Sequence, residues 1–347
     1  MQHSIQTPAR TRPLASLSLD LDNKWAYLKT HGDAGWREFP SYLDVVVPRA
    51  LDFLRERGLT ITFFVVGQDA ALDKNLDALR QIAPAGHEIG NHSFHHEPWL
   101  HLYSEREIEQ ELSRAEDAIE RATGERPLGF RGPGFSLSHA TLRVLARRGY
   151  LYDASTFPTF LGPLARAYYF MTAKLTDEER EKRKALFGTL RDGLQPVKPY
   201  RWRVGGALLT EIPVTTMPLF KLPIHVSYLL YLGGVSRSLA LRYFQTALAF
   251  CCLTGTQPSL LLHPLDFLGV DDTPDLAFFP AMRQTSARKL QLVGEALRML
   301  SAQFDVVTMR EHARAVLELS PEIPLVEAQT LRAVAGSMHS IGSEAQS

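Results

Sequence analysis

The sequence of 347 residues predicts an α/β fold, a distorted (β/α) barrel of seven to eight strands with helical insertions. Segments typical of strands alternate with segments typical of helices almost from the start of the chain, as βα units around a parallel sheet or barrel do. Hydrophobic residues make up 45% of the sequence, which is enough for a sizeable core. Several strand segments end on acidic residues or histidines, at the position where barrels of this class place their active sites.

Eight segments have the composition of strands. Residues 16–21 alternate apolar and polar side chains, and residues 60–66 are rich in β-branched and aromatic side chains. The other candidates are residues 88–91, 128–130, 151–153, 208–213, 259–263 and 304–307. We expect them to form one barrel domain over residues 14–310.

Helices are predicted between these strands. Residues 104–123 give the clearest one, because Ser104 and Glu107 form a capping box ahead of an apolar stripe with helical spacing. Residues 138–148 and 285–300 show the same spacing. The uncharged stretch 243–265 contains Pro258, which would break a membrane span, so we interpret it as a helix, a turn and a buried strand.

Two segments are too long to be simple βα loops, and we expect them to be insertions at about residues 161–193 and 218–253. The second is rich in Leu, Tyr and Phe. Residues 325–347 are polar and rich in small residues, which predicts a polar C-terminal tail.

Composition excludes several classes of protein. The 38 Lys and Arg residues balance 38 Asp and Glu residues, so no global basic field exists to bind nucleic acid. The two cysteines, Cys251 and Cys252, are adjacent, which excludes a disulfide scaffold and a thiolate zinc site. The first residues lack the apolar segment of a signal peptide, and we therefore expect a cytoplasmic protein.

The first candidate site lies at the end of the first strand, where Asp20 and Asp22 alternate with leucines. A period of two places both carboxylates on one face, about 7 Å apart. The alternative is a strand that simply runs into an Asp/Asn turn. Two carboxylates that face one way near a barrel centre are costly without a cation, however, which favours a functional role.

His92 and His96 follow the third strand segment and are four residues apart, a spacing that can bring two imidazoles to one point. Pro98 limits any helix here, so we expect a turn, with His95 pointing elsewhere. Two structural histidines are the alternative. With a carboxylate from another strand end, a metal site that keeps open positions for water is favoured.

Three further features follow strand segments: Arg131 in the sequence Arg-Gly-Pro-Gly, Asp153, and His263. With these five features in order, the chain resembles the polysaccharide deacetylases with NodB homology, carbohydrate esterase family 4, over about residues 14–307. The resemblance implies that Asp22, His92 and His96 bind the metal and that Asp20 is the catalytic base. It also implies that Arg131 orients that base, that His263 is the catalytic acid, and that Asp153 tunes the acid.

The chain departs from the family pattern at two motifs. The usual adjacent pair of aspartates is split as Asp20-Leu21-Asp22, as in an intracellular-type variant. Gly134 follows Pro133 where an aromatic residue is expected. The two insertions are not part of the minimal family domain.

The resemblance implies a metal-dependent hydrolase that removes an N-acyl group, acetyl or formyl, from an amino sugar. The substrate would be a polysaccharide or a glycan precursor linked to polyprenyl phosphate. We expect Zn²⁺ first, with another divalent transition metal as the alternative, to polarise the acyl carbonyl and activate water. Asp20 would accept the water's proton, and His263 would protonate the leaving amine.

Two other classes of protein share parts of this pattern. Two histidines and a carboxylate also bind Fe(II) in non-haem iron enzymes, usually as His-x-Asp with a distant histidine on a β-sandwich. A non-catalytic carbohydrate- or lipid-binding module would need neither Asp20 nor His263.

A cytoplasmic deacetylase needs a substrate on the inner face of the membrane, which favours a lipid-linked sugar. Residues 218–236 carry many apolar side chains and the single charge of Lys221, and Arg237 and Arg242 follow. This composition is typical of a segment in peripheral contact with a membrane. The alternative is a cover for the barrel or a dimer interface.

Overall fold

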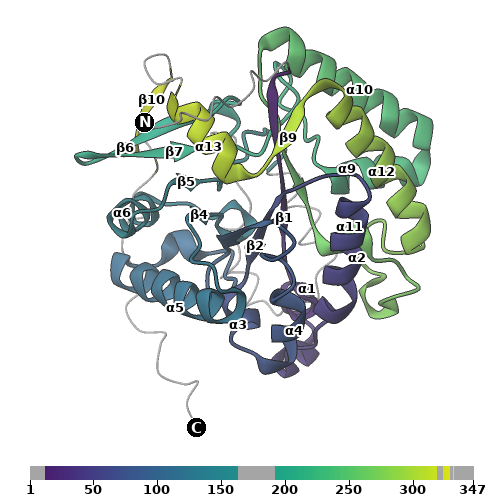
Figure 1. Ribbon diagram of the computed structural model, residues 1–347, viewed down its shortest axis with the longest axis horizontal. Helices are drawn as coiled ribbons and strands as arrows, with labels where there is room; N and C mark the ends of the chain where they lie inside the picture. The colour runs from purple at the N-terminus through teal and green to yellow at the C-terminus, as the bar shows by residue number, and fades with distance from the viewer. Residues whose placement is uncertain (1–11, 163–191, 319–322, 329–330, 332–347) are drawn as a thin grey trace, which may run out of the picture.

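The computed structural model describes residues 12–162, 192–318, 323–328 and 331. The insertion expected at residues 161–193 lies outside these ranges except for its ends. The described chain forms a central sheet with helices around it (Figure 1). The predicted α/β class and barrel are confirmed.

One sheet contains all the strands of the described chain, in the order β10-β6-β7-β5-β4-β3-β2-β1-β8, with β9 paired to the start of β1. The strands are β1 (Leu14–Asp20), β2 (Thr62–Val65), β3 (Glu88–Asn91), β4 (Gly129–Phe130), β5 (Tyr152–Asp153), β6 (Tyr200–Val204), β7 (Ala207–Glu211), β8 (Ser259–Leu262), β9 (Asp305–Val307) and β10 (Leu325–Glu327). All eight predicted strand segments are present.

The sheet curls round so that the chain after β7 meets β8. The Thr215 N–H donates to the Ser259 carbonyl at 2.9 Å, and the Ser259 N–H donates to Thr215 Oγ1 at 2.7 Å. These two bonds form a seam that closes a ring of β1, β2, β3, β4, β5, β7 and β8. The neighbouring pairs within β7-β5-β4-β3-β2-β1-β8 are parallel, so their carboxyl ends meet on one side of the barrel.

The α-helices and shorter 3₁₀ helices connect and cover the strands. The α-helices are α1 (Lys24–His31), α2 (Leu43–Arg55), α3 (Gly67–Ala70), α4 (Leu76–Leu79), α5 (Glu105–Thr123), α6 (His139–Arg148), α9 (Val226–Val235), α10 (Arg237–Thr254), α11 (Pro264–Phe267), α12 (Ser286–Gln303) and α13 (Met309–Glu318). The 3₁₀ helices are η1 (Ala34–Glu38), η2 (Asp73–Asn75), η3 (Leu100–Leu102), η4 (Pro133–Phe135), η6 (Asp192–Leu194) and η7 (Pro274–Leu276). The predicted capping box of Ser104 and Glu107 is present at the start of α5.

The segment 218–253 contains α9 and nearly all of α10, which pack against each other and against α12. Helix α10 ends at Gly255, whose φ of 62° lies in the left-handed region, and β8 follows, as the sequence predicts for residues 243–265. Within the described ranges, no helix is both long enough and apolar enough to cross a membrane.

Strands β6 and β10 are not among the predicted strands. β6 pairs antiparallel with β7, and β10 pairs parallel with β6. The segment expected to be a polar tail from residue 325 therefore begins as an edge strand, in which Leu325 pairs with Arg201.

Gly90 in β3 makes room for the ring of Phe64 in β2. A Cβ at this position would lie 2.5 Å from Phe64 Cδ1, closer than real side chains approach. The position of that ring matters for the site, because the Arg131 guanidinium carbon lies 4.4 Å from its centroid.

We expect Gly90→Ala to lower the free energy of unfolding by about 1–3 kcal/mol, because the Phe64 ring must move within a packed core. Gly206→Ala is the matched control, since a Cβ there meets nothing within 4 Å. Urea unfolding of both variants measures the effect. Equal midpoints for the two variants would contradict the proposed clash.

Candidate metal centre and active site

Asp20 is the last residue of β1, and Asp22 follows it in a tight turn. The Asp22 N–H donates to the Asp20 carbonyl at 2.8 Å. Leu21 between them is buried in the hydrophobic core. The alternation in the sequence thus directs the leucine into the core and leaves both carboxylates to the carboxyl end of the barrel.

His92 and His96 lie on a turn that starts where β3 ends at Asn91. Asn91 Oδ1 accepts the Ser93 N–H at 2.8 Å, and Ser93 Oγ accepts the His96 N–H at 3.2 Å. Ser93 (φ 62°) and His96 (φ 54°) both have left-handed backbone conformations. The predicted turn is confirmed, and it brings the two imidazole centroids to 5.0 Å.

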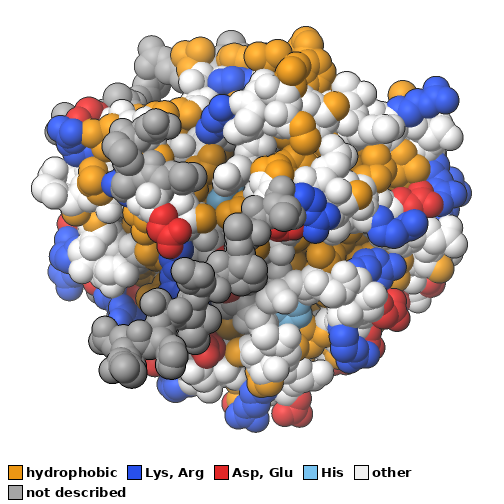
Figure 2. Space-filling view, turned by 45° about the horizontal axis from the view of Figure 1, so that its top comes forward, with side chains coloured by type: hydrophobic (Ala, Val, Ile, Leu, Met, Phe, Trp, Pro, Cys, Tyr) orange, Lys and Arg blue, Asp and Glu red, His pale blue; other side chains and the backbone are white. Residues whose placement is uncertain are grey.

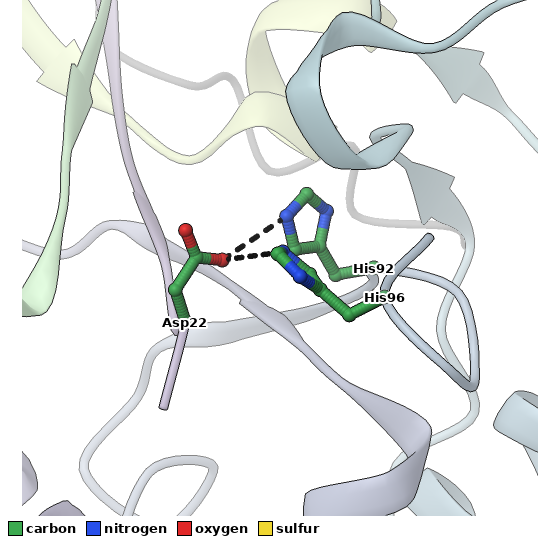
Figure 3. A group of neighbouring side chains, drawn as sticks. All are labelled: Asp22, His92 and His96. Carbon is green, nitrogen blue, oxygen red and sulfur yellow. Dashed lines mark ion pairs between the residues drawn. The ribbon is translucent and has the colours of Figure 1, made fainter. Parts of the chain in front are cut away.

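The two imidazoles point at the carboxylate of Asp22 (Figure 3). Asp22 Oδ1 lies 2.9 Å from His96 Nε2 and 3.3 Å from His92 Nε2. His92 Nδ1 lies 2.6 Å from the Arg131 carbonyl, so it carries the proton and leaves Nε2 available as a ligand. This is the arrangement of a metal-binding histidine fixed by a second hydrogen bond.

The three side chains fit a metal ion. Their candidate ligand atoms lie within 4.8 Å of one another. Apart from the ion pairs within this group, the buried atoms Asp22 Oδ1 and His96 Nε2 have no hydrogen-bond partner. Buried polar atoms with so few partners are costly, and a cation between them would satisfy both. Two imidazole nitrogens and one carboxylate oxygen form a donor set typical of catalytic zinc, with open coordination positions.

Electrostatics within this group favours the ionised carboxylate. Burial raises the pKa of Asp22, but the adjacent His96 and His92 outweigh it and hold the pKa well below its usual range. Burial lowers the pKa of His92, but Asp20 and Asp22 outweigh it, so that pKa is raised. The acidic charge that favours protonated imidazole here would equally favour a bound metal cation.

His95 points away from this group, as predicted. Its Nδ1 bonds the carboxylate of Glu111, which also accepts the backbone N–H of His95 at 3.0 Å. Its Nε2 faces Arg114 at 3.3 Å. His95 therefore anchors the turn to α5 and offers no ligand to the metal.

Arg131 is fully buried and holds Asp20 in place. Its guanidinium donates from Nη1 to Asp20 Oδ1 at 2.7 Å and to Ser18 Oγ at 2.8 Å, and from Nε to the Ala154 carbonyl at 3.0 Å. Asp20 Oδ2 lies 4.0 Å from His92 Nε2, so the fixed carboxylate stands beside the proposed metal ligands. This geometry agrees with a base oriented by an arginine.

His263 begins α11 and has partners that differ from the predicted one. Its Nδ1 lies 3.1 Å from Ser227 Oγ, and its backbone N–H donates to Asp266 Oδ2 at 2.8 Å. Asp153 instead accepts the Ser155 hydroxyl at 2.6 Å and lies beside Glu211. Among the described residues, no hydrogen bond or ion pair joins Asp153 to His263, and β7 lies between β5 and the seam beside β8.

Asp153 and Glu211 form a buried pair of carboxyl groups. Burial raises the pKa of Asp153, and the adjacent Glu211 raises it further. Glu211 accepts the Thr156 hydroxyl at 2.6 Å and the Trp202 indole N–H at 2.8 Å. Through these hydrogen bonds the pair links β5, β6 and β7.

A cavity of about 210 Å³ opens beside Asp22 and His263. The sequence did not single out its other polar lining residues, His225, Ser227 and Asp266, and Tyr27 and Tyr231 add aromatic surface. His225 is buried, its Nδ1 makes no hydrogen bond, and burial lowers its pKa well below the usual range, with His263 and Arg131 adding to the effect. A neutral imidazole therefore lines this cavity.

Fold and site together define a (β/α) barrel with a carboxylate and two imidazoles converging at the carboxyl ends of its strands. Residues 33–152 match the family model of polysaccharide deacetylases. The resemblance drawn from the motifs is thus confirmed over these residues. The matched range contains His92, His96 and Arg131.

Curated relatives agree with this assignment. A peptidoglycan deacetylase of Helicobacter pylori is 30% identical over 112 residues, which are 32% of this chain and 37% of the relative. A peptidoglycan-N-acetylmuramic acid deacetylase of Bacillus subtilis is 34% identical over 110 residues, 31% of this chain and 41% of the relative. The chain thus spans less than half the length of both relatives.

A solved structure extends the fold comparison to nearly the whole chain. A polysaccharide-deacetylase structure from Mycobacterium smegmatis aligns with a TM-score of 0.58 at 21% identity. The alignment covers 90% of this chain and 97% of that one. It supports the fold.

We expect Asp22→Ala, His92→Ala and His96→Ala each to lose most of the bound metal, because each removes one of three ligands. His95→Ala is the matched control and should retain it, since His95 bonds Glu111 instead. Elemental analysis of the purified variants measures occupancy. Full occupancy in the His96 variant would show that the assigned ligand set is wrong.

Proposed function

We propose that this protein is a metal-dependent hydrolase that removes an N-acyl group, acetyl or formyl, from an amino sugar of a glycan. The observation that carries the proposal is the convergence of three kinds of group at one end of the barrel. These are the candidate ligands Asp22, His92 and His96, the Asp20–Arg131 pair, and His263. The proposal is supported by the two curated relatives, which are a peptidoglycan deacetylase and a peptidoglycan-N-acetylmuramic acid deacetylase.

A divalent metal, for which zinc is our first choice, would polarise the acyl carbonyl and lower the pKa of a water molecule at the site. Asp20 has its Oδ1 held by Arg131 and would accept that water's proton through its other oxygen. The water oxygen would bond to the acyl carbon, and the C–N bond of the amide would break to give the carboxylic acid and the amine. His263 would give a proton to the departing amine, which is a poor leaving group without it.

Rival functions lack a use for parts of this site. Burying the Arg131–Asp20 ion pair costs desolvation free energy. A binding module would gain nothing from holding a carboxylate in this way. A non-haem iron enzyme would need no proton donor placed like His263. Release of acetate or formate from N-acylated glycans, with and without a chelator, separates hydrolysis from both alternatives.

We expect Asp20→Asn and His263→Ala to keep the metal while losing about 10² to 10⁴ in rate, the usual contribution of a general base or acid. Neither residue belongs to the ligand set. Acyl release and metal content measured on the same preparations test this. Near-normal turnover in either variant would contradict the role assigned to that residue.

We further propose that the substrate is linked to a membrane lipid and that the protein contacts the membrane peripherally. In the segment 218–236, Leu219 is 72% exposed and Phe220 is 56% exposed. Leu239 on α10 is also half exposed, and Arg242 lines a shallow groove beside Phe250. Figure 2 shows hydrophobic side chains along the upper edge of the molecule, the side on which Figure 1 places α10.

Other residues of this segment have a structural role. Leu229 and Leu230 are buried in the barrel's core, and Arg237 pairs with Glu295. The exposed subset, rather than the whole segment, is what supports a membrane contact. Apolar side chains next to arginine suit the boundary between acyl chains and lipid phosphates.

We expect the protein to float with anionic liposomes and the double variant Leu219→Ser/Phe220→Ser to float less. Leu208→Ser is the matched control, because Leu208 is 53% exposed but lies on β7. Deacylation rates on lipid-linked and free sugars complete the test. Absence of flotation, together with equal rates on free oligosaccharide, would overturn the lipid-linked substrate.

A further inference from the structure

His263 is part of a closed ring of hydrogen bonds with Ser227 and Asp266. Ser227 Oγ lies 3.1 Å from His263 Nδ1 and donates to Asp266 Oδ1 at 2.9 Å. The second oxygen of the same carboxylate accepts the backbone N–H of His263 at 2.8 Å. Helix α9 supplies the serine and α11 supplies the aspartate, so the ring joins two elements that are distant in the sequence.

The number of protons fixes the direction of these bonds. A serine hydroxyl has one proton, and a carboxylate can only accept. Because Ser227 gives its proton to Asp266, it can only accept at His263. This bond therefore favours the imidazole form with its proton on Nδ1, and Nε2 is left as the atom that can exchange a proton with a substrate in the adjoining cavity.

The charged and titratable groups around His263 are few within the described chain. Burial raises the pKa of Asp266, while His263 and the ammonium of Lys289 oppose this effect. Burial lowers the pKa of Lys289 to about 8, and that ammonium is bonded to the carbonyls of Leu265 and Leu268. On the cavity side, the neutral His225 lies 5.9 Å from His263, centroid to centroid, and Asp22 and the hydroxyls of Tyr27 and Tyr231 complete the set.

We propose that Ser227 and Asp266 are the positioning residues of His263, forming a relay that holds the imidazole in the Nδ1–H form and stabilises its cation. The catalytic consequence rests on the proposed function: the relay readies Nε2 to protonate the departing amine. Asp153, to which the family resemblance assigns this task, is bonded to Ser155, just after β5, and to Glu211. The carboxylate that serves His263 is that of Asp266, three residues further along the chain in α11.

Nuclear magnetic resonance of the full-length, metal-loaded protein with ¹⁵N-labelled histidine tests the relay without any reaction. The His263 signals are assigned by their loss in His263→Gln. In the neutral imidazole we expect the Nδ1–H form in the wild type, a mixture of both forms in Ser227→Ala, and a return to Nδ1–H in Ser227→Thr, which restores the hydroxyl. An unchanged Nδ1–H form in Ser227→Ala would overturn the relay.

The pH dependence of acyl release tests its consequence. We expect Ser227→Ala and Asp266→Asn to lower kcat by about 10- to 100-fold with little change in KM, the range found when a group that orients a catalytic residue is lost. The alkaline limb of the profile should move to lower pH in Asp266→Asn, because the negative charge that favours the protonated imidazole is gone. In Asp153→Asn that limb should stay in place.

The proposed function and the proposed relay can be overturned by different results. A wild-type protein that releases no acyl group from any N-acylated glycan would overturn the proposed function, while the resonance experiment would still decide the relay. An active enzyme whose alkaline limb follows Asp153 rather than Asp266 would overturn the relay and leave the hydrolase intact.

Discussion

The buried guanidinium of Arg131 is the interaction on which the rest of the site depends. The guanidinium has no exposed surface, and a buried charge is stable only when its partners are placed to bond it. Breaking a buried ion pair costs about 3–5 kcal/mol. Arg131 bonds Asp20 on β1 from Nη1 and the carbonyl that follows β5 from Nε, while its Nη2 has no hydrogen-bond partner. Its own carbonyl fixes the ring of His92. One residue thus sets the positions of the proposed base and of a proposed metal ligand together.

A second buried carboxyl group, that of Asp69, is linked through Trp25 to the turn that carries His96. Asp69 accepts hydrogen bonds from the Asn23 amide at 2.7 Å and the Trp25 indole at 2.9 Å. The Trp25 ring packs edge-on against His96, with centroids 6.3 Å apart. Burial raises the pKa of Asp69 to about 7, and its Oδ2 has no partner, which is consistent with a carboxyl group that is partly protonated at neutral pH. The ring of His96 is therefore held by packing against Trp25 and by its ion pair with Asp22.

The sequence was sufficient for those features that depend on short-range patterns. Alternation in residues 16–21 predicted which side Asp20 and Asp22 share, and the spacing of His92 and His96 predicted a turn that the structure contains. Strand β6 was missed although Tyr200, Trp202 and Val204 alternate with arginines, and all three are buried. β10 was missed because three residues in a polar context carry too little signal to oppose a prediction of a tail.

The hydrogen-bond partners of His263 could not be predicted from the sequence, for a different reason. Ser227 approaches from α9, and only the packing of α9 against α11 brings it there. Asp266 was accessible in principle, since an acidic residue three positions after a helix start is typical of a cap. The role of Asp153 came from the family resemblance. In the structure, β7 lies between β5, which carries Asp153, and the seam beside β8. Contacts across a barrel depend on strand order, which a single sequence encodes only weakly.

The seam between β7 and β8 has a consequence for how such a barrel diversifies. Every other junction in the ring is a strand ladder, whereas this one is joined through Thr215 and Ser259. The chain leaves the barrel after Thr215, forms α9 and α10, and returns at Ser259. A change in the length of the segment between Thr215 and Ser259 leaves the pairing of the strands unchanged. It does change which residues lie next to His263. The residues that line the cavity can therefore change in evolution while the strand order that brings Asp22, His92 and His96 together is kept.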